Sequence, residues 1–487
     1  MTSGRSDTTP NPSAAKLRRK VIGLAIAAAV GGFLFGFDSS VVNGAVVAVQ
    51  GEFDLSAALI GFAVASALLG CALGAYLAGR LADRWGRIKV MLLGAVLFFV
   101  SSIGAGAAFA VWDLVLWRVV GGLGIGIASV IAPTYISEIA PKAIRGALAS
   151  LQQLAITLGI FAALLSDTLI AEGAGGASDP YWFGVAAWRW MFIACAVPAI
   201  VYGLLALTLP ESPRYLATRG KSEEARKVLA TVTPRDEVDE ALNDIQQKID
   251  EDAENAQRSS LRGPALGLLP VVWVGILLSV FQQFVGINVI FYYSTSLWSA
   301  VGFDESNSFA ISVFTSIVNV VVTFVAIFLV DKVGRKPLLL VGSAGMAISL
   351  ALMAIAFSQS TISGDEVSLP GAWGPIALVS ANAFVVFFGA TWGPLVWVLL
   401  GEIFPNRIRA AALGLAASAQ WIANFLITVT FPILSQDVSL TLAYGLYATF
   451  AALSFIFVFM FVPETKGRSL EEMDTLHIRT VMKSARK

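Results

Sequence analysis

Twelve long apolar stretches, separated by short polar segments, run along the chain from about residue 21 to residue 462. A helix needs about 20 apolar residues to cross the hydrocarbon core of a bilayer. The stretches lie near residues 21–47, 58–79, 88–110, 112–134, 147–168, 188–209, 265–297, 308–330, 337–357, 372–400, 410–434 and 440–462. The pattern predicts an all-α membrane protein with twelve transmembrane helices in two six-helix halves.

The polar segments at the two ends and in the middle of the chain set the predicted domains. An N-terminal tail covers residues 1–20, and the first six-helix half covers 21–209. A charged linker follows over 210–264, where apolar residues recur at helical spacing and predict a small helical domain. The second half covers 265–462, and a C-terminal tail covers 463–487.

The positive charges are distributed unevenly between the two sides of the predicted membrane. All but two of the 33 Lys and Arg lie in the tails or in the even-numbered loops, and the exceptions are Arg118 and Arg189. Positive loops face the cytoplasm, so both termini and the linker domain are predicted to be cytoplasmic. The short tails, without an organelle signal, favour a bacterial inner membrane.

Composition excludes several classes of function. The chain is 57% hydrophobic and 14% charged with a net charge of zero, which fits a protein embedded in a lipid bilayer and argues against a nucleic-acid partner. The two cysteines lie in apolar runs and offer no disulfide framework or metal site. Without a phosphate-binding loop or a nucleophile–base arrangement, we expect no enzyme and no cofactor.

Three amides interrupt the apolar stretch 265–297, in the segment FQQFVGINVIFYY: Gln282, Gln283 and Asn288. An unpaired amide is unfavourable in a bilayer core, so the cluster should face a cavity or a ligand. On a straight helix Gln283 and Asn288 would lie about 140° apart. Gly286 permits a break that would gather them around one solute. The alternative is hydrogen bonding between packed helices.

Two charges stand alone inside spans, Asp38 in the first and Arg118 in the fourth. A charge at the centre of a membrane helix costs roughly 2.5–3.5 kcal/mol, so these residues should pair, neutralise or meet water. A carboxylate whose partner can be displaced is a workable proton carrier. The alternative is a static ion pair between the two spans.

Charged motifs repeat between the two halves and predict parallel structural repeats around a central pathway. Clustered ion pairs formed between the halves could latch the cytoplasmic side closed, although topology signalling alone also explains some Lys and Arg. The candidate latch residues are Asp83, Arg84, Arg87, Glu138, Arg145, Glu211, Arg214, Asp331, Arg335, Glu402, Arg409 and Glu464.

Seven motifs together resemble the sugar porters of the major facilitator superfamily over residues 20–475. They are DRWGR (83–87), RVVGGLGIG (118–126), PESPR (210–214), QQFVGIN (282–288), DKVGR (331–335), WGPLVWVLLGEIFP (392–405) and PETKG (463–467). The motifs are most similar to those of bacterial sugar/proton symporters of the xylose or glucose type, and are related to those of mammalian facilitative glucose transporters. The resemblance implies alternating access to a central sugar site.

The resemblance also implies which residues contact the sugar. Amides can pair with hydroxyls without adding charge, and an indole offers a flat apolar face to the ring. The matching positions are Gln153, Gln282, Gln283, Asn288, Trp392, Gln420, Trp421 and Asn424. Tyr292 and Tyr293 match the extracellular gate, with Tyr292 also counted as a substrate contact. Phe35 and Asn319 are candidates for either a sugar contact or helix packing.

A second gate is expected in the tenth span. Gly389, Gly393 and Pro394 flank Trp392 and predict a helix break that would let the end of this span move.

Proton coupling follows from the resemblance, because proton-coupled sugar porters have an acid at the position of Asp38 and passive ones typically lack it. Arg118 would modulate its ionisation. The expected partners are a monosaccharide of the glucose or xylose class, the proton and the lipid bilayer. The alternatives are an uncoupled facilitator of a sugar or myo-inositol, and a non-transporting sugar sensor.

Overall fold

The computed structural model describes residues 12–140, 145–258, 261–363, 366–405 and 408–466. The elements in chain order are α1 (Pro12–Glu52), α2 (Ala57–Trp85), α3 (Arg87–Gly106), α4 (Val111–Ile139), α5 (Arg145–Ala174), η1 (Trp182–Gly184), α6 (Ala187–Ala194), α7 (Ala196–Thr208), α8 (Pro213–Thr218), α9 (Ser222–Val232), α10 (Val238–Arg258), α11 (Pro270–Phe284), α12 (Ile287–Tyr292), α13 (Ser294–Ser299), α14 (Glu305–Val333), α15 (Arg335–Ser358), β1 (Thr361–Ser363), β2 (Glu366–Ser368), α16 (Trp373–Phe387), η2 (Phe388–Trp392), α17 (Gly393–Ile403), α18 (Arg409–Pro432), η3 (Ile433–Val438) and α19 (Leu440–Phe461).

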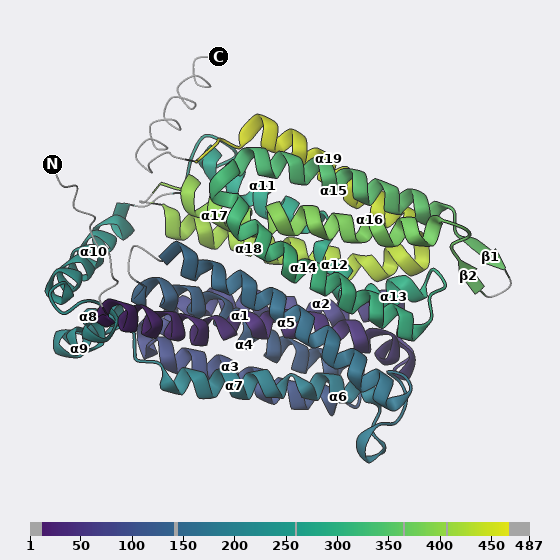
Figure 1. The fold of residues 1–487 in the computed structure, drawn as a ribbon, viewed down its shortest axis with the longest axis horizontal. Coiled ribbons are helices and arrows are strands. Elements are labelled where there is room, and N and C mark those ends of the chain that lie inside the picture. The colour runs from purple at the N-terminus through teal and green to yellow at the C-terminus, as the bar shows by residue number, and fades with distance from the viewer. Residues whose placement is uncertain (1–11, 141–144, 259–260, 364–365, 406–407, 467–487) are drawn as a thin grey trace, which may run out of the picture.

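Within these described ranges, 12 helical segments are long and apolar enough to cross a membrane, which confirms the predicted number. Several spans combine consecutive elements: α6 with α7, α11 with α12, and α16 with η2 and α17. Figure 1 shows α1 to α7 along one side of the molecule and α11 to α19 along the other. The halves meet where α2 packs on α18 and α5 packs on α14.

The two ends of the bundle are distinct in Figure 1. At one end, called here the linker end, lie the linker helices α8, α9 and α10. At the other, called the hairpin end, β1 and β2 pair in antiparallel register between α15 and α16, with Thr361 opposite Ser368. The linker helices were predicted from the sequence, but this hairpin was not.

Small residues allow the helices of the first half to approach closely. A Cβ at Gly122 on α4 would lie 1.9 Å from the backbone oxygen of Ala67 on α2. A Cβ at Gly36 on α1 would lie 2.0 Å from the backbone oxygen of Ile156 on α5. Van der Waals contact between close backbones is a principal source of helix association in lipid, so these glycines hold the first half together.

Candidate functional site

The predicted break at Gly286 is present and brings two amides together. Gly286 has φ of 83°, in the left-handed region that glycine adopts without steric penalty, between the end of α11 and the start of α12. Beyond it, Asn288 Nδ2 donates a hydrogen bond to Gln283 Oε1 at 2.6 Å. The break therefore overcomes the angular separation that a straight helix would impose.

Gln282 connects three elements of the second half. Its Nε2 donates to the backbone oxygens of Trp392 at 3.0 Å and Gly393 at 3.1 Å. Its Oε1 accepts from Gln420 Nε2 on α18 at 2.8 Å. The amide cluster thus lies where α11, the η2–α17 junction and α18 meet.

Trp392 contributes to this cluster through its backbone rather than through an exposed indole face. Its side chain is 0% exposed, and the indole N–H donates to Leu339 O at 3.1 Å and to Ser343 Oγ at 3.0 Å on α15. The expectation that the ring offers an open apolar surface does not hold for this conformation. Residue type indicates an indole but not the direction in which it points.

The predicted break around Trp392 is a widened helical turn instead. The segment α16–η2–α17 continues through a single π-helical turn over Phe388–Trp392, and Pro394 lies in the first turn of α17. A π turn can absorb the proline, which lacks an N–H, without ending the helix. Such turns are frequent at functional sites, so the segment remains a candidate for movement.

The tyrosine pair after the amides packs against α18. Tyr293 donates its hydroxyl to Thr428 O at 3.0 Å, and its ring lies 5.2 Å from that of Phe431. Tyr292 is also buried. Asn424 is buried on the same helix and accepts a hydrogen bond from Thr428 Oγ1 at 3.1 Å.

The remaining sugar-contact candidates come from both halves. The rings of Phe35 on α1 and Trp421 on α18 meet edge to face at 5.5 Å, which joins the halves. Gln153 is half-buried on α5, and Asn319 is buried on α14. A Cβ at Gly389 would lie 3.3 Å from Asn319 Oδ1, so Asn319 lies beside the η2 turn.

The two isolated charges form one buried ion pair in the first half. Arg118 Nη1 on α4 lies 2.8 Å from Asp38 Oδ1 on α1, and both side chains are buried. The guanidinium also lies over the ring of Phe192, 5.8 Å from its centroid. Removing one member of such a pair would leave an uncompensated buried charge.

A contact that the sequence reading missed joins the halves at the hairpin end. The backbone N–H of Thr295 donates to Asn43 Oδ1 at 2.8 Å, and Thr295 Oγ1 donates to the backbone oxygen of Asn43. Further along α1, Gln50 exchanges hydrogen bonds of 2.9 and 3.2 Å with Gln436 of the second half. Polar residues near helix ends are common, so sequence alone gave little signal for this pairing.

At the linker end, the first-half charges gather around Arg87. Its Nη2 lies 2.8 Å from Glu138 Oε1, and its Nη1 lies 3.2 Å from Asp83 Oδ1. Glu211 Oε1 accepts from the backbone N–H of Arg87 at 2.9 Å. This cluster holds together three helices and the start of the linker.

The second half repeats that arrangement around Arg335. Its Nη2 lies 2.9 Å from Glu402 Oε1, while Glu464 accepts from the backbone N–H groups of Arg335 at 3.1 Å and Lys336 at 3.0 Å. Partial burial alone would raise the pKa of Glu464, but these bonds and those from Lys466 and Thr465 lower it below its ordinary value.

The expected latch between the halves, which would form when the linker end is closed, stays a prediction. Each ion pair around Arg87 and Arg335 joins residues of one half. Arg84 is exposed and Arg214 is half-buried. The side chains of Arg145, Asp331 and Arg409 lie outside the described residues. Sequence spacing predicted the charges and their repeat but not which half supplies each partner.

Two repeated six-helix halves, a central amide cluster and one buried Asp–Arg pair define a membrane transporter for a small polar solute. The chain belongs to the sugar transporter family: the model described as "Sugar (and other) transporter" matches residues 24–477. The protein is therefore a transporter and not an enzyme.

Individual relatives match nearly the whole chain. The glucose transport protein of Synechocystis sp. is 54% identical over 96% of this chain and 99% of its own. The D-xylose-proton symporter of Escherichia coli K12 is 36% identical over 94% of this chain and 95% of its own. The inward open conformation of the xylose transporter XylE from E. coli matches with a TM-score of 0.80 at 35% identity, covering 94% of this chain and 99% of that one.

Proposed function

We propose that this protein imports a monosaccharide of the glucose or xylose class together with a proton, by alternating access. The observation that carries the proposal is the buried Asp38–Arg118 pair, in the same molecule as a central cluster of neutral amides. Similarity to a glucose transport protein and to a D-xylose-proton symporter supports the substrate class and the coupling ion.

Asp38 carries the proton in this mechanism. While the carboxylate is ionised, it holds Arg118 at 2.8 Å, and separating the two would leave two unpaired charges in a low-dielectric interior. Protonation of Asp38 removes one of these two charges and weakens the hold on Arg118, which can then move toward water or another partner. The conformational change of the first half is thereby linked to proton binding.

The amides bind the sugar. Gln282, Gln283, Asn288 and Gln420 already form a connected chain of donors and acceptors. A sugar hydroxyl can replace these mutual bonds without leaving a buried polar group unpaired. Phe35 and Trp421 offer apolar ring surface from opposite halves, while Gln153, Asn319 and Asn424 complete the polar lining.

The conformation described here is inward-facing in this proposal. The halves are joined by Asn43 and Thr295 at the hairpin end, while the charged clusters at the linker end are satisfied within each half. The match to the inward open conformation of XylE supports this assignment. In the outward-facing state, the charges around Arg87 and Arg335 would exchange partners and connect the halves.

The membrane orientation follows the positive charges. The linker end, with α8 to α10, faces the cytoplasm of a bacterium, and the hairpin end faces outward. The domain boundaries at residues 20, 209, 264 and 462 belong to the same proposal.

The test is external pH in a weakly buffered suspension of energy-depleted cells that express the protein. Glucose, xylose, galactose and myo-inositol are added one at a time. Alkalinisation with one of them identifies proton symport and its substrate together. Tracer sugar entering down its gradient without a pH change would identify an uncoupled facilitator.

Asp38→Asn is the matched variant for this test. The amide keeps the shape of the side chain but cannot carry a proton, so we expect sugar-dependent alkalinisation and accumulation to be lost while sugar exchange is retained. Sugar still concentrated by the variant would contradict the role of Asp38.

A further inference from the structure

A second carboxyl group, Asp167, is enclosed within the first half. It lies on α5 and is 0% exposed. Its carboxyl group packs on the backbone of Gly44 in α1, where a Cβ would lie 2.6 Å from Asp167 Oδ2. Gly36 lies beside Ile156 in the same helix pair, so α1 and α5 run in parallel. Asp167 is therefore about 9 Å nearer to the hairpin end than Asp38, at about 1.5 Å per helical residue.

Among the described residues, neither carboxyl oxygen of Asp167 has a side-chain hydrogen-bond partner. Toward the hairpin end, the charged groups on the described helices packed against α5 are engaged elsewhere: Asp38 with Arg118, Glu52 with Arg189, Asp113 with the backbone N–H of Phe109, and Glu305 with the backbone N–H of Ala177. The Cys195 thiol, at the junction of α6 and α7, is also buried. A buried carboxylate without a cation is strongly unfavourable, so this enclosure suits a neutral carboxylic acid.

The contact between the halves lies on the same turn of α1. Asn43 directly precedes Gly44, is fully buried, and holds Thr295 through its side-chain and backbone oxygens. Its Nδ2 has no hydrogen-bond partner among the described residues. Separation of Asn43 from Thr295 would expose this turn of α1, in which the next residue, Gly44, packs on Asp167.

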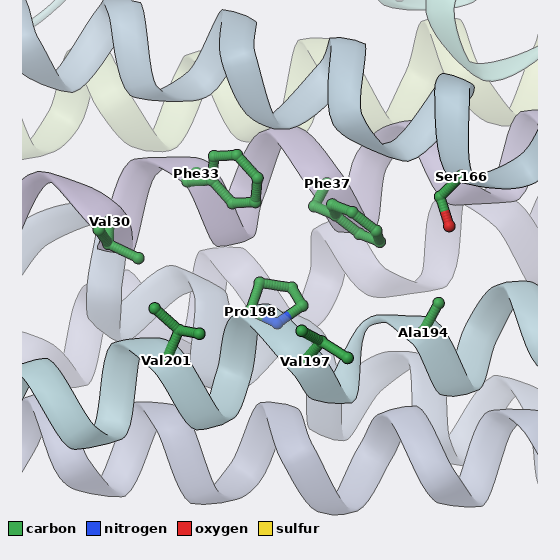
Figure 2. Close-up of a pocket in the computed structure, with 8 residues that line it drawn as sticks. All are labelled: Val30, Phe33, Phe37, Ser166, Ala194, Val197, Pro198 and Val201. Carbon is green, nitrogen blue, oxygen red and sulfur yellow. The ribbon is translucent and has the colours of Figure 1, made fainter.

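An apolar groove lies between the helices that surround Asp38 and Asp167. Figure 2 shows a groove between α1, α5, α6 and α7, with a volume of about 440 Å³. Its lining includes Phe37, Ser166 and Ala194. These residues directly precede Asp38, Asp167 and Cys195 in the sequence. Lipid chains facing this groove cannot supply a proton, so the aqueous route to Asp167 runs through the hairpin end.

We propose that Asp167 is a second proton-binding site of this transporter, loaded from the extracellular side when Asn43 and Thr295 separate. The assignment rests on the alternating access proposed above. In the outward-facing state, water reaches the carboxylate, and a proton from that water binds one carboxyl oxygen. The neutral acid can then be enclosed again, whereas the ionised form keeps the hairpin end open and hydrated.

The distance between the halves at the hairpin end tests this site directly. Ser178 and Ser360 are exposed on opposite halves there, and the two native cysteines are buried, so spin labels at Ser178→Cys and Ser360→Cys report opening. Distances are recorded on the full chain in lipid nanodiscs from acidic to alkaline pH. In the labelled parent, we expect the long-distance population to grow as the pH rises.

In this background, Asp167→Asn behaves as a permanently neutral residue and should lose the pH response, keeping the short distance throughout. Asp113→Asn is the matched control, because Asp113 is also a buried acid of the first half and only caps the start of α4. It should respond like the parent. An Asp167→Asn response with the parent's midpoint, or an equal loss in Asp113→Asn, would overturn the proposal.

Two further variants keep the result interpretable. Asp167→Glu replaces Asp167→Asn if the latter does not fold, as judged by size-exclusion chromatography. It keeps a titratable group at an altered position, so the pH midpoint of the distance change should shift. An unchanged midpoint would contradict the proposal. Asp38→Asn removes the charge that holds Arg118, so it should lose sugar-driven proton uptake and shift the distance populations at every pH, but the pH response that depends on Asp167 should remain. Failure of sugar–proton coupling and failure of the Asp167 site are thus separate outcomes.

Discussion

At the residue scale, Gln282 is the side chain on which the central cluster depends. Its removal would leave the backbone oxygens of Trp392 and Gly393 and the amide of Gln420 without their shared partner. An unsatisfied buried polar group costs about 1–3 kcal/mol. For Gln282→Ala we therefore expect the KM for sugar to rise by roughly ten-fold to a hundred-fold, measured by initial rates of tracer uptake.

Asn382→Ala is the control for that substitution. Asn382 is half-buried on α16 and donates only to Leu378 O of its own helix, at 2.9 Å. Its removal should leave KM within about two-fold of the parent, in line with the modest net value of a single part-buried bond within one helix. Equal effects of the two substitutions would show that the cluster has no special part in sugar binding.

At the scale of single elements, the break between α11 and α12 depends on Gly286. Any L residue at φ of 83° is strained by roughly 1–2 kcal/mol, and a Cβ here would lie 2.7 Å from the ring of Tyr447. Gly286→Ala should therefore lower both thermal stability and sugar transport. Gly445→Ala, on α19 with open space around its Cβ, is the control and should change neither. Full transport by Gly286→Ala would mean that the break is not required.

The start of α15 carries a predicted pH dependence through Glu464. Its folded-state pKa is below the ordinary value of 4.5, so the ionised form contributes stability above that value. This contribution is lost as the pH falls through the lowered pKa. Glu464→Gln should reduce the melting temperature at neutral pH, and the difference from the parent should vanish in strong acid. Thermal unfolding in detergent across this range measures it, with exposed Glu251→Gln as the control.

Hydropathy and glycine placement predicted the elements well, because span length and the left-handed conformation at Gly286 depend on local chemistry. The indole direction of Trp392, the π turn at η2 and the short hairpin β1–β2 were beyond that reading. The indole direction depends on packing against an element distant in the chain, as the contact of Trp392 with Ser343 on α15 shows. The repeated charges were also predictable from sequence, whereas the atoms that pair around Arg87 and Arg335 required the structure.

At the scale of the whole molecule, the contact between Asn43 and Thr295 should set the balance between the two facing states. Thr295→Val keeps the side-chain shape but removes the hydroxyl that donates to Asn43, so closure at the hairpin end loses about 1 kcal/mol. The outward-facing population should rise about five-fold, measured as the long-distance fraction between labels at Ser178→Cys and Ser360→Cys. Thr430→Val, which removes an exposed hydroxyl bonded within α18, should leave the fraction unchanged. An unaltered fraction in Thr295→Val would mean that closure of this end is held by other contacts, such as the packing of α2 on α18.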